Sequence, residues 1–358
     1  AQANGITNPA LIQAGQVLRI PPLATATATP ASTPTASSTP TRIASVTPTR
    51  TPTRTPSPTP TQSKATATPR PTNTPTAQPA VLSGKIAFTV WNTTAGAYEL
   101  YVSRIDGSGR NLLGLGLRQP QFRKDGNVLA ANGDGKPDFE HLVKMNAGGG
   151  ELVEISNHTE DAFPTWSPDG NIVAYSSEAY GDDQTRLGIV YDIFGKQWDW
   201  IHTSTTEVRG EYPFWMADGR IVYHGCAFLT DHANCGLFWV RAGGGNYVQL
   251  TNHSRDTGPA GSGSRVAFMS TRDGNWEIYL INMDGNGLKR LTNNSAQDGL
   301  PTWSPDGKSI AFVSNRDGGW AIWVMDASGS NQRKLFSLNG GYGSGEYDWT
   351  TERISWAP

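Results

Sequence analysis

A repeated sequence unit, found from residue 84 to the end of the chain, constrains the fold more than any other feature. Its clearest copy is residues 301–326, PTWSPDGKSIAFVSNRDGGWAIWVMD. The Ser-Pro-Asp-Gly step at 304–307 predicts a tight turn, because Pro fixes φ and Gly tolerates the turn exit. The continuous apolar run at 310–313 is typical of a strand buried on both faces. With further strands ending at Trp303 and covering 320–325 and 332–336, the unit predicts one four-stranded propeller blade.

Copies of the Trp303 position give the number of blades. Phe122, Trp166 and Trp215 occupy that position upstream, and the interval from Trp215 to Trp303 leaves room for another unit at 258–286, whose first strand lacks the Trp. Residues 84–114 supply three strands without a first one, and the last copy of the motif surrounds Trp356. We therefore predict an all-β fold for 84–358, a six-bladed β-propeller in which the C-terminal strand closes the N-terminal blade. A period of about 45 residues favours a propeller over a sandwich.

These repeats resemble the TolB-like, WD-repeat-type propeller family, whose unit is close to P-x-W-S-P-D-G-x-x-I-A-F followed by R-D-G. The resemblance covers 84–358 and is strongest in blades three, five and six. It implies the fold and a role as a binding platform, and some propellers of this kind precede a serine-hydrolase domain. No G-x-S-x-G nucleophile motif occurs in this sequence.

Two segments precede the propeller. Residues 1–22 resemble the C-terminal half of a LysM module, which binds N-acetylglucosamine polymers, on the matches ANGI at 3–6 and GQVLRIP at 15–21. The first half of the module is absent, so we expect a fragment or a processed chain. Residues 23–80 are rich in Thr and Pro and predict an extended, low-complexity tail. This composition indicates an O-glycosylated stalk, with an unmodified spacer as the alternative; candidate sites are Thr47, Thr49, Thr51, Thr53, Thr55, Ser57 and Thr59.

Charge divides sharply between the tail and the propeller. Residues 1–83 contain six Lys or Arg and no Asp or Glu, so the net charge of −2 is the sum of +6 and −8. An acidic propeller argues against nucleic acid as its ligand. The opposite charges favour contact between tail and propeller, within or between molecules. We expect that in an assembly a tail strand at Val17, Leu18, Arg19 and Ile20 pairs with an open blade edge of a neighbour.

The only cysteines, Cys226 and Cys235, flank the connection between the second and third strands of blade four. Neighbouring strands would bring them within bonding reach, and two cysteines in an otherwise thiol-free chain suit an oxidising compartment. We predict a disulfide. The alternative is zinc, because His224 and His232 could complete a set of four ligands with the two thiolates.

Acidic residues and one tryptophan mark the expected binding rim. Asp161 and Asp298 each lie five residues before a motif Trp, and Glu211 and Asp256 have comparable positions. They could ring one mouth of the channel and attract a cation or a basic peptide, or each could cap its own turn. Asp134, Asp138 and Glu140 could suggest calcium but lack the full spacing of an EF-hand loop. Trp349 is off the motif and is a candidate for a surface role.

Long loops on the same side, at 133–140, 178–186, 227–234 and 340–351, predict that this rim binds a partner. The histidines form no H-E-x-x-H signature, and neither a cofactor nor a metal is predicted. Three functions remain: a non-catalytic extracellular or cell-surface propeller that binds protein subunits and builds a fibre; a cell-wall glycan-binding protein; or a metal-dependent lyase or hydrolase. The first is our main hypothesis.

Overall fold

The computed structural model describes residues 82–133, 141–150, 152–156, 160–178, 184–191, 197–202, 207–226, 234–340, 342 and 348–358. The chain divides into two units, Ala1–Asn73 and Thr74–Pro358, and all described residues lie in the second. Apart from one 3₁₀ turn, η4 (Trp349–Thr351), the named elements are strands. No helix in the described part of the chain is long and apolar enough to cross a bilayer.

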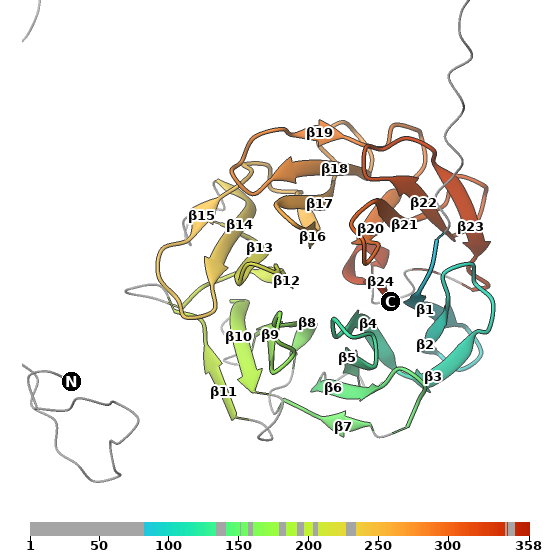
Figure 1. Ribbon diagram of the computed structural model, residues 1–358, viewed down its shortest axis with the longest axis horizontal. Helices are drawn as coiled ribbons and strands as arrows, with labels where there is room; N and C mark the ends of the chain where they lie inside the picture. Colours follow the sequence, from blue (N-terminus) through green and yellow to red (C-terminus); the bar gives the residue numbers. More distant parts are fainter. Residues whose placement is uncertain are drawn as a thin grey trace, which may run out of the picture. The chain divides into compact units, whose positions relative to one another are not determined.

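Six four-stranded antiparallel sheets stand around a central axis as the blades of a propeller (Figure 1). Blade 1 contains β24 (Ser355–Ala357), β1 (Lys85–Asn92), β2 (Ala97–Arg104) and β3 (Asn111–Leu115); blade 2, β4 (Leu117–Phe122), β5 (Val128–Gly133), β6 (His141–Asn146) and β7 (Val153–Glu154); blade 3, β8 (Ala162–Trp166), β9 (Ile172–Ser177), β10 (Arg186–Tyr191) and β11 (Gln197–Trp200). Blade 4 contains β12 (Glu211–Trp215), β13 (Arg220–Cys226), β14 (Cys235–Arg241) and β15 (Val248–Gln249); blade 5, β16 (Thr257–Ser262), β17 (Arg265–Ser270), β18 (Glu277–Asn282) and β19 (Lys289–Arg290); blade 6, β20 (Asp298–Trp303), β21 (Ser309–Ser314), β22 (Ala321–Asp326) and β23 (Arg333–Ser337). The predicted fold is confirmed.

The core lies between the blades, because the second strand of each blade is buried on both faces. Every residue of β21 is buried, as its apolar run predicts. The motif tryptophans connect neighbouring blades: the Trp303 indole packs with Ala260 and Ile278 of blade 5, and its Nε1 donates to the carbonyl of Ala260 at 2.9 Å. Trp166 makes the same bond to Gln121 of blade 2. The repeated Trp is therefore a packing residue.

The Ser-Pro-Asp-Gly motif forms the predicted turn after the inner strand. Ser304 Oγ donates to Asp306 Oδ1 at 2.6 Å and accepts from the Ser309 amide at 2.9 Å. Gly307 has a φ of +68°, a conformation that costs a residue with a side chain more than it costs glycine. The turn thus fixes the angle at which β21 leaves β20.

The ring is closed by the two ends of the propeller. β24 supplies the inner strand of blade 1 and pairs antiparallel with β1, with Ile86 opposite Trp356. The Trp356 Nε1 donates to the Ser83 carbonyl at 2.9 Å. The predicted closure is confirmed.

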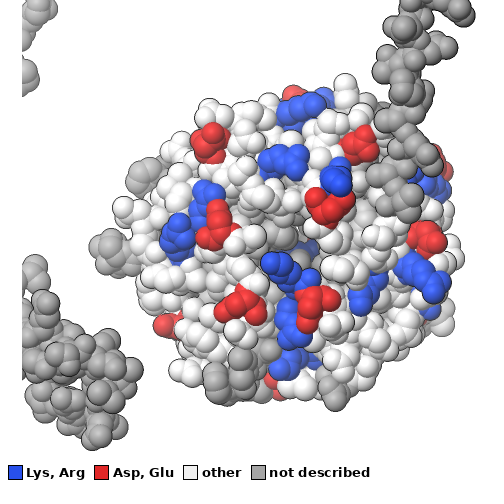
Figure 2. Space-filling model, viewed as in Figure 1, with Lys and Arg blue, Asp and Glu red and all other residues white. Residues whose placement is uncertain are grey.

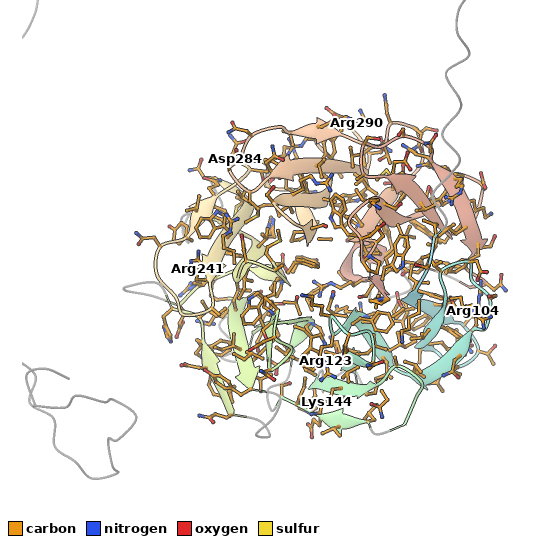
Figure 3. All side chains as sticks on the ribbon, viewed as in Figure 1. Arg104, Arg123, Lys144, Arg241, Asp284 and Arg290 are labelled. Atoms are coloured by element: carbon orange, nitrogen blue, oxygen red, sulfur yellow. A yellow bond between two sulfur atoms is a disulfide. The ribbon has the colours of Figure 1, made fainter. Side chains whose placement is uncertain are left out.

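The antiparallel order gives the propeller two distinct faces. The face where the inner strands begin also carries the connections between second and third strands, and we call it the long-loop face. The opposite face carries the turns that follow the first and third strands, and we call it the short-turn face. Figure 3 labels three residues at these turns, Arg123, Arg241 and Asp284. Figures 2 and 3 show the molecule from the same direction, so these labels help to locate the turns in Figure 2.

Candidate functional site

The acidic side chains predicted to ring one mouth of the channel lie at the starts of the inner strands, but three of them are buried. Asp161, Asp256 and Asp298 have no exposed surface. Asp256 pairs with Arg272 and Asp298 with Arg316, each at 2.5 Å between Nη2 and Oδ2. These two carboxylates are therefore committed to arginines rather than presented to the channel.

The arginines come from the R-D-G turn between the second and third strands of blades 5 and 6. Arg272 also lies over the ring of Tyr279, 4.9 Å from its centroid, and Arg316 lies 4.5 Å from that of Trp323. Each R-D-G turn is thus joined to the start of its own inner strand by a buried ion pair and an aromatic contact. Within the described ranges, no group of three or more His, Cys, Asp and Glu is arranged to hold a metal ion.

Glu211 is the predicted rim carboxylate that remains partly exposed. It lies opposite His224 in the ladder of β12 and β13. Burial raises the pKa of Glu211 to about 7, and the negative charge of Glu178 adds to the effect. Glu211 therefore changes charge near neutral pH.

A cluster of three partly buried tryptophans lies on the long-loop face at blades 5 and 6. Trp349, which the sequence singled out, contacts Trp320 at a centroid distance of 4.9 Å and Trp276 at 6.2 Å. Arg255 stacks over Trp276 at 5.6 Å. We call Trp276, Trp320 and Trp349 the tryptophan cluster. Trp276 and Trp320 were not predicted as site residues, although both follow an R-D-G turn and precede a third strand.

The inner strands of blades 2 to 6 share a β-bulge three residues before the motif position. The register shifts there, and Gln119, Phe163, Tyr212 and Leu300 have φ between 52° and 55°. Positive φ is uncommon for such residues, and bulges of this kind re-aim a side chain. The same position in blade 1 is Arg353. We call the six residues at this position the collar: Gln119, Phe163, Tyr212, Gly258, Leu300 and Arg353.

Arg353 reaches from blade 1 to the inner strands of blades 3 and 4. Its Nη1 donates to the Pro164 carbonyl at 2.6 Å and its Nη2 to the Pro213 carbonyl at 3.0 Å. The guanidinium also lies 5.6 Å from the centroid of Phe163. Burial lowers the pKa of Arg353 to about 10, so the side chain stays charged at neutral pH.

The residue before Arg353 is Glu352, and both of its carboxylate oxygens already accept hydrogen bonds from other residues. Glu352 Oε1 accepts from Arg118 at 2.6 Å, and Oε2 accepts from the Thr89 hydroxyl at 2.9 Å. Burial raises the pKa of Glu352, and the charge of Arg118 opposes that shift. This buried pair joins blades 1 and 2 beside the channel.

Below the collar the channel widens on the short-turn face into a hollow of about 420 Å³. We call this hollow the bowl. Its wall consists of the motif residues Phe122, Trp166, Trp215, Trp303 and Trp356 and the turns that follow them. Figure 2 shows a hollow near the centre of the propeller, with both basic and acidic side chains around it.

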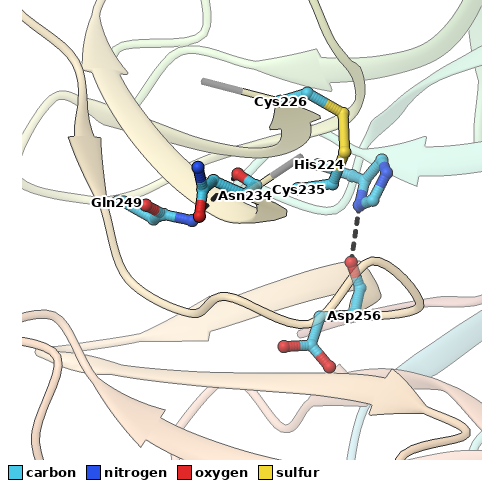
Figure 4. The surroundings of a disulfide bond; sticks show 6 residues. All are labelled: His224, Cys226, Asn234, Cys235, Gln249 and Asp256. Atoms are coloured by element: carbon cyan, nitrogen blue, oxygen red, sulfur yellow. Dashed lines mark hydrogen bonds between the residues drawn. A yellow bond between two sulfur atoms is a disulfide. The ribbon is translucent and has the colours of Figure 1, made fainter. Parts of the chain in front are cut away.

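Cys226 and Cys235 form the predicted disulfide, which joins the end of β13 to the start of β14 (Figure 4). The zinc alternative fails because both sulfur atoms are bonded to each other. His224 Nδ1 instead donates to the Asp256 carbonyl at 2.7 Å, which links blade 4 to blade 5.

Several predicted sites lie outside the described residues: Asp134, Asp138, His232, the tail strand at 17–20, and the stalk residues Thr47, Thr49, Thr51, Thr53, Thr55, Ser57 and Thr59.

Comparisons with known proteins agree with this architecture. Residues 252–354 match the family model of the TolB β-propeller domain. The Tol-Pal system protein TolB of Desulfosudis oleivorans is 49% identical over 45 residues, 13% of this chain and 10% of the relative. An uncharacterized protein of Agrobacterium fabrum is 32% identical over 160 residues, 40% of this chain and 50% of the relative. The chain thus spans half or less of the length of these relatives.

Among solved structures, TolB from Acinetobacter baumannii superposes with a TM-score of 0.62 at 17% identity, covering 77% of this chain and 67% of that chain. A putative TolB from Agrobacterium tumefaciens gives a TM-score of 0.54 at 19% identity, covering 78% and 99%. At these identities the likeness shows the fold, a TolB-like six-bladed propeller.

Proposed function

We propose that this chain is a non-catalytic, extracellular or cell-surface propeller that binds partner proteins through its long-loop face. The observation that carries the proposal is the tryptophan cluster, where Trp276, Trp320 and Trp349 are partly exposed beside Arg255. Tryptophan and arginine dominate the binding energy of protein interfaces. The rigid blades hold these side chains in place before a partner arrives, which reduces the entropic cost of binding.

The partner in this proposal is a second copy of the chain. The Thr/Pro-rich residues 23–80 form a glycosylated stalk, and the basic N-terminal tail of one molecule lies on the acidic propeller of the next. The charges of +6 and −8 on the two parts supply the attraction. Repetition of this head-to-tail contact builds a surface fibre.

Sedimentation velocity and electron microscopy of the full chain test this function. We expect assembly that increases with protein concentration and weakens as salt is raised from 0.05 M to about 0.5 M, because salt screens the attraction. The double variant Trp320→Ala, Trp349→Ala should assemble at least about tenfold less readily.

The matched control is Trp239→Ala, which removes a partly exposed tryptophan of β14 that stacks with Arg220. This variant should assemble like the wild type. Monomers at every concentration would contradict the fibre, and equal assembly of the double variant would remove the tryptophan cluster from the interface.

A further inference from the structure

The collar holds one positive charge, that of Arg353, whose contacts with described residues are all with uncharged groups. In the described part of the chain, the hydrogen bonds of the Arg353 guanidinium go to the Pro164 and Pro213 carbonyls, and none of its contacts is an ion pair. A guanidinium has five N–H donors, and these two bonds use only some of them. Arg353 lines a small void of about 20 Å³ that it shares with Phe163, Tyr212 and Leu300.

The neighbouring carboxylate does not balance this charge. Glu352 also lines the void, but its two oxygens accept from Arg118 and Thr89. The Arg118–Glu352 pair is neutral as a unit, so Arg353 is a surplus positive charge among the described residues that line the void. Arg353 is partly exposed, and a charge partly withdrawn from water without a counter-ion is stabilised by a bound anion.

The void lies next to the bowl, because Gln121, Phe214 and Thr302 line both. The bowl adds two basic residues, Arg123 and Lys124, of which Arg123 is paired with Asp125 at 2.7 Å. No Asp or Glu is among the described residues that line the bowl. The described lining of the bowl therefore carries basic side chains and no carboxylate, although the propeller as a whole is acidic.

The volumes of the void and of the bowl limit the size of the ligand that each can hold. A void of about 20 Å³ holds a group no larger than about a water molecule or two, and the bowl, at about 420 Å³, holds a few residues of an extended chain. A carboxylate is planar, small and matched to the donor fork of arginine. We propose that the collar and the bowl bind an extended peptide from the short-turn face, with one carboxylate of the peptide seated on Arg353. This site lies on the face opposite the tryptophan cluster and does not depend on the proposed assembly.

Three labelled peptides distinguish the source of the carboxylate. The first is a fluorescein-labelled hexapeptide, Gly-Ser-Gly-Ser-Ala-Ala, with a free C-terminus; the second is its C-terminal amide; the third is the amide with aspartate in place of the second serine. Fluorescence anisotropy with the full chain at low salt measures binding. We expect the free acid or the aspartate peptide to bind at least about tenfold more tightly than the plain amide.

Two variants test the assignment to Arg353. Arg353→Met removes the charge while keeping a long side chain, and should weaken binding of the carboxylate peptide about tenfold or more. Gln121→Glu keeps Arg353 but places a competing carboxylate in the shared wall, and should also abolish the preference for the acid over the amide. Because Gln121→Glu leaves Arg353 in place, it tests the site even if Arg353→Met fails to fold.

The matched control is Arg110→Met. Arg110 stacks on Phe336 at the outer edge of the propeller and donates to the Ser337 carbonyl. Binding should be unchanged in this variant and in Trp349→Ala. The proposal is overturned if the acid and amide peptides bind equally, or if Gln121→Glu binds like the wild type.

Discussion

Single titratable side chains control how the propeller responds to pH, and Glu211 has the clearest effect. Burial raises its pKa from 4.5 to about 7 in the folded state. A raised pKa means that the folded state holds the proton more tightly, so this stabilisation is complete below pH 4.5 and is lost as pH rises through 7. We expect Glu211→Gln to gain roughly 1–3 kcal/mol of stability relative to the wild type between pH 5 and pH 8.

Urea unfolding of both proteins at the two pH values measures this difference. Taking the difference cancels the opposite contribution of His224, whose pKa is lowered by burial. Glu178→Gln serves as a control, because removing its charge should bring the pKa of Glu211 closer to its ordinary value. Parallel pH profiles for wild type and Glu211→Gln would refute the assignment.

At the scale of elements, the disulfide makes the connection between β13 and β14 a short closed loop. It joins residues nine positions apart. Restricting a loop of this length in the unfolded chain stabilises the fold by about 2–3 kcal/mol. Replacing both Cys226 and Cys235 by Ser should therefore lower the free energy of unfolding by that amount in urea.

Reduction provides the control for this prediction. Dithiothreitol should destabilise the wild type by the same amount and leave the double variant unchanged. Equal stability of the oxidised wild type and the variant would mean that the loop is already constrained without the bond.

Some structural elements could be predicted from the sequence, and others could not. The Ser-Pro-Asp-Gly turns, the buried second strands and the motif tryptophans each have a local signal, so the blades and their number could be predicted. The collar has none, because it depends on bulges with positive φ at Phe163, Tyr212 and other residues that have side chains. The pairing of Asp298 with Arg316 was missed for a similar reason: only the sheet register brings the two together.

For the molecule as a whole, stability depends on closure of the ring by β24. Trp356 packs among Ile86, Phe88 and Ile354 and bonds to the Ser83 carbonyl. Trp356→Ala should lower the free energy of unfolding by about 3–5 kcal/mol, because it removes a large buried side chain and the bond with it. Hydrogen exchange by mass spectrometry should show faster exchange in β1, the strand that pairs with β24.

Trp239→Ala is the comparison, since Trp239 is partly exposed and belongs to an uninterrupted blade. Trp239→Ala should lower the free energy of unfolding by less than Trp356→Ala does, and it should leave hydrogen exchange in β1 unchanged. Faster exchange spread evenly over all blades in Trp356→Ala would indicate that the ring does not open at blade 1.

Closure by a strand from the other end of the propeller also sets its mechanical behaviour. Lys85 lies opposite Ala357, so the first residue of β1 meets the last residue of β24, and the two strands share three residue pairs. Tension between residue 84 and the C-terminal residue would peel these pairs apart in succession at low force. Tension between residue 84 and the long-loop face would instead load the eight pairs of β1 and β2 in shear, all at once. A propeller pulled by its N-terminal segment would therefore be mechanically strong or weak according to where the opposing load is attached.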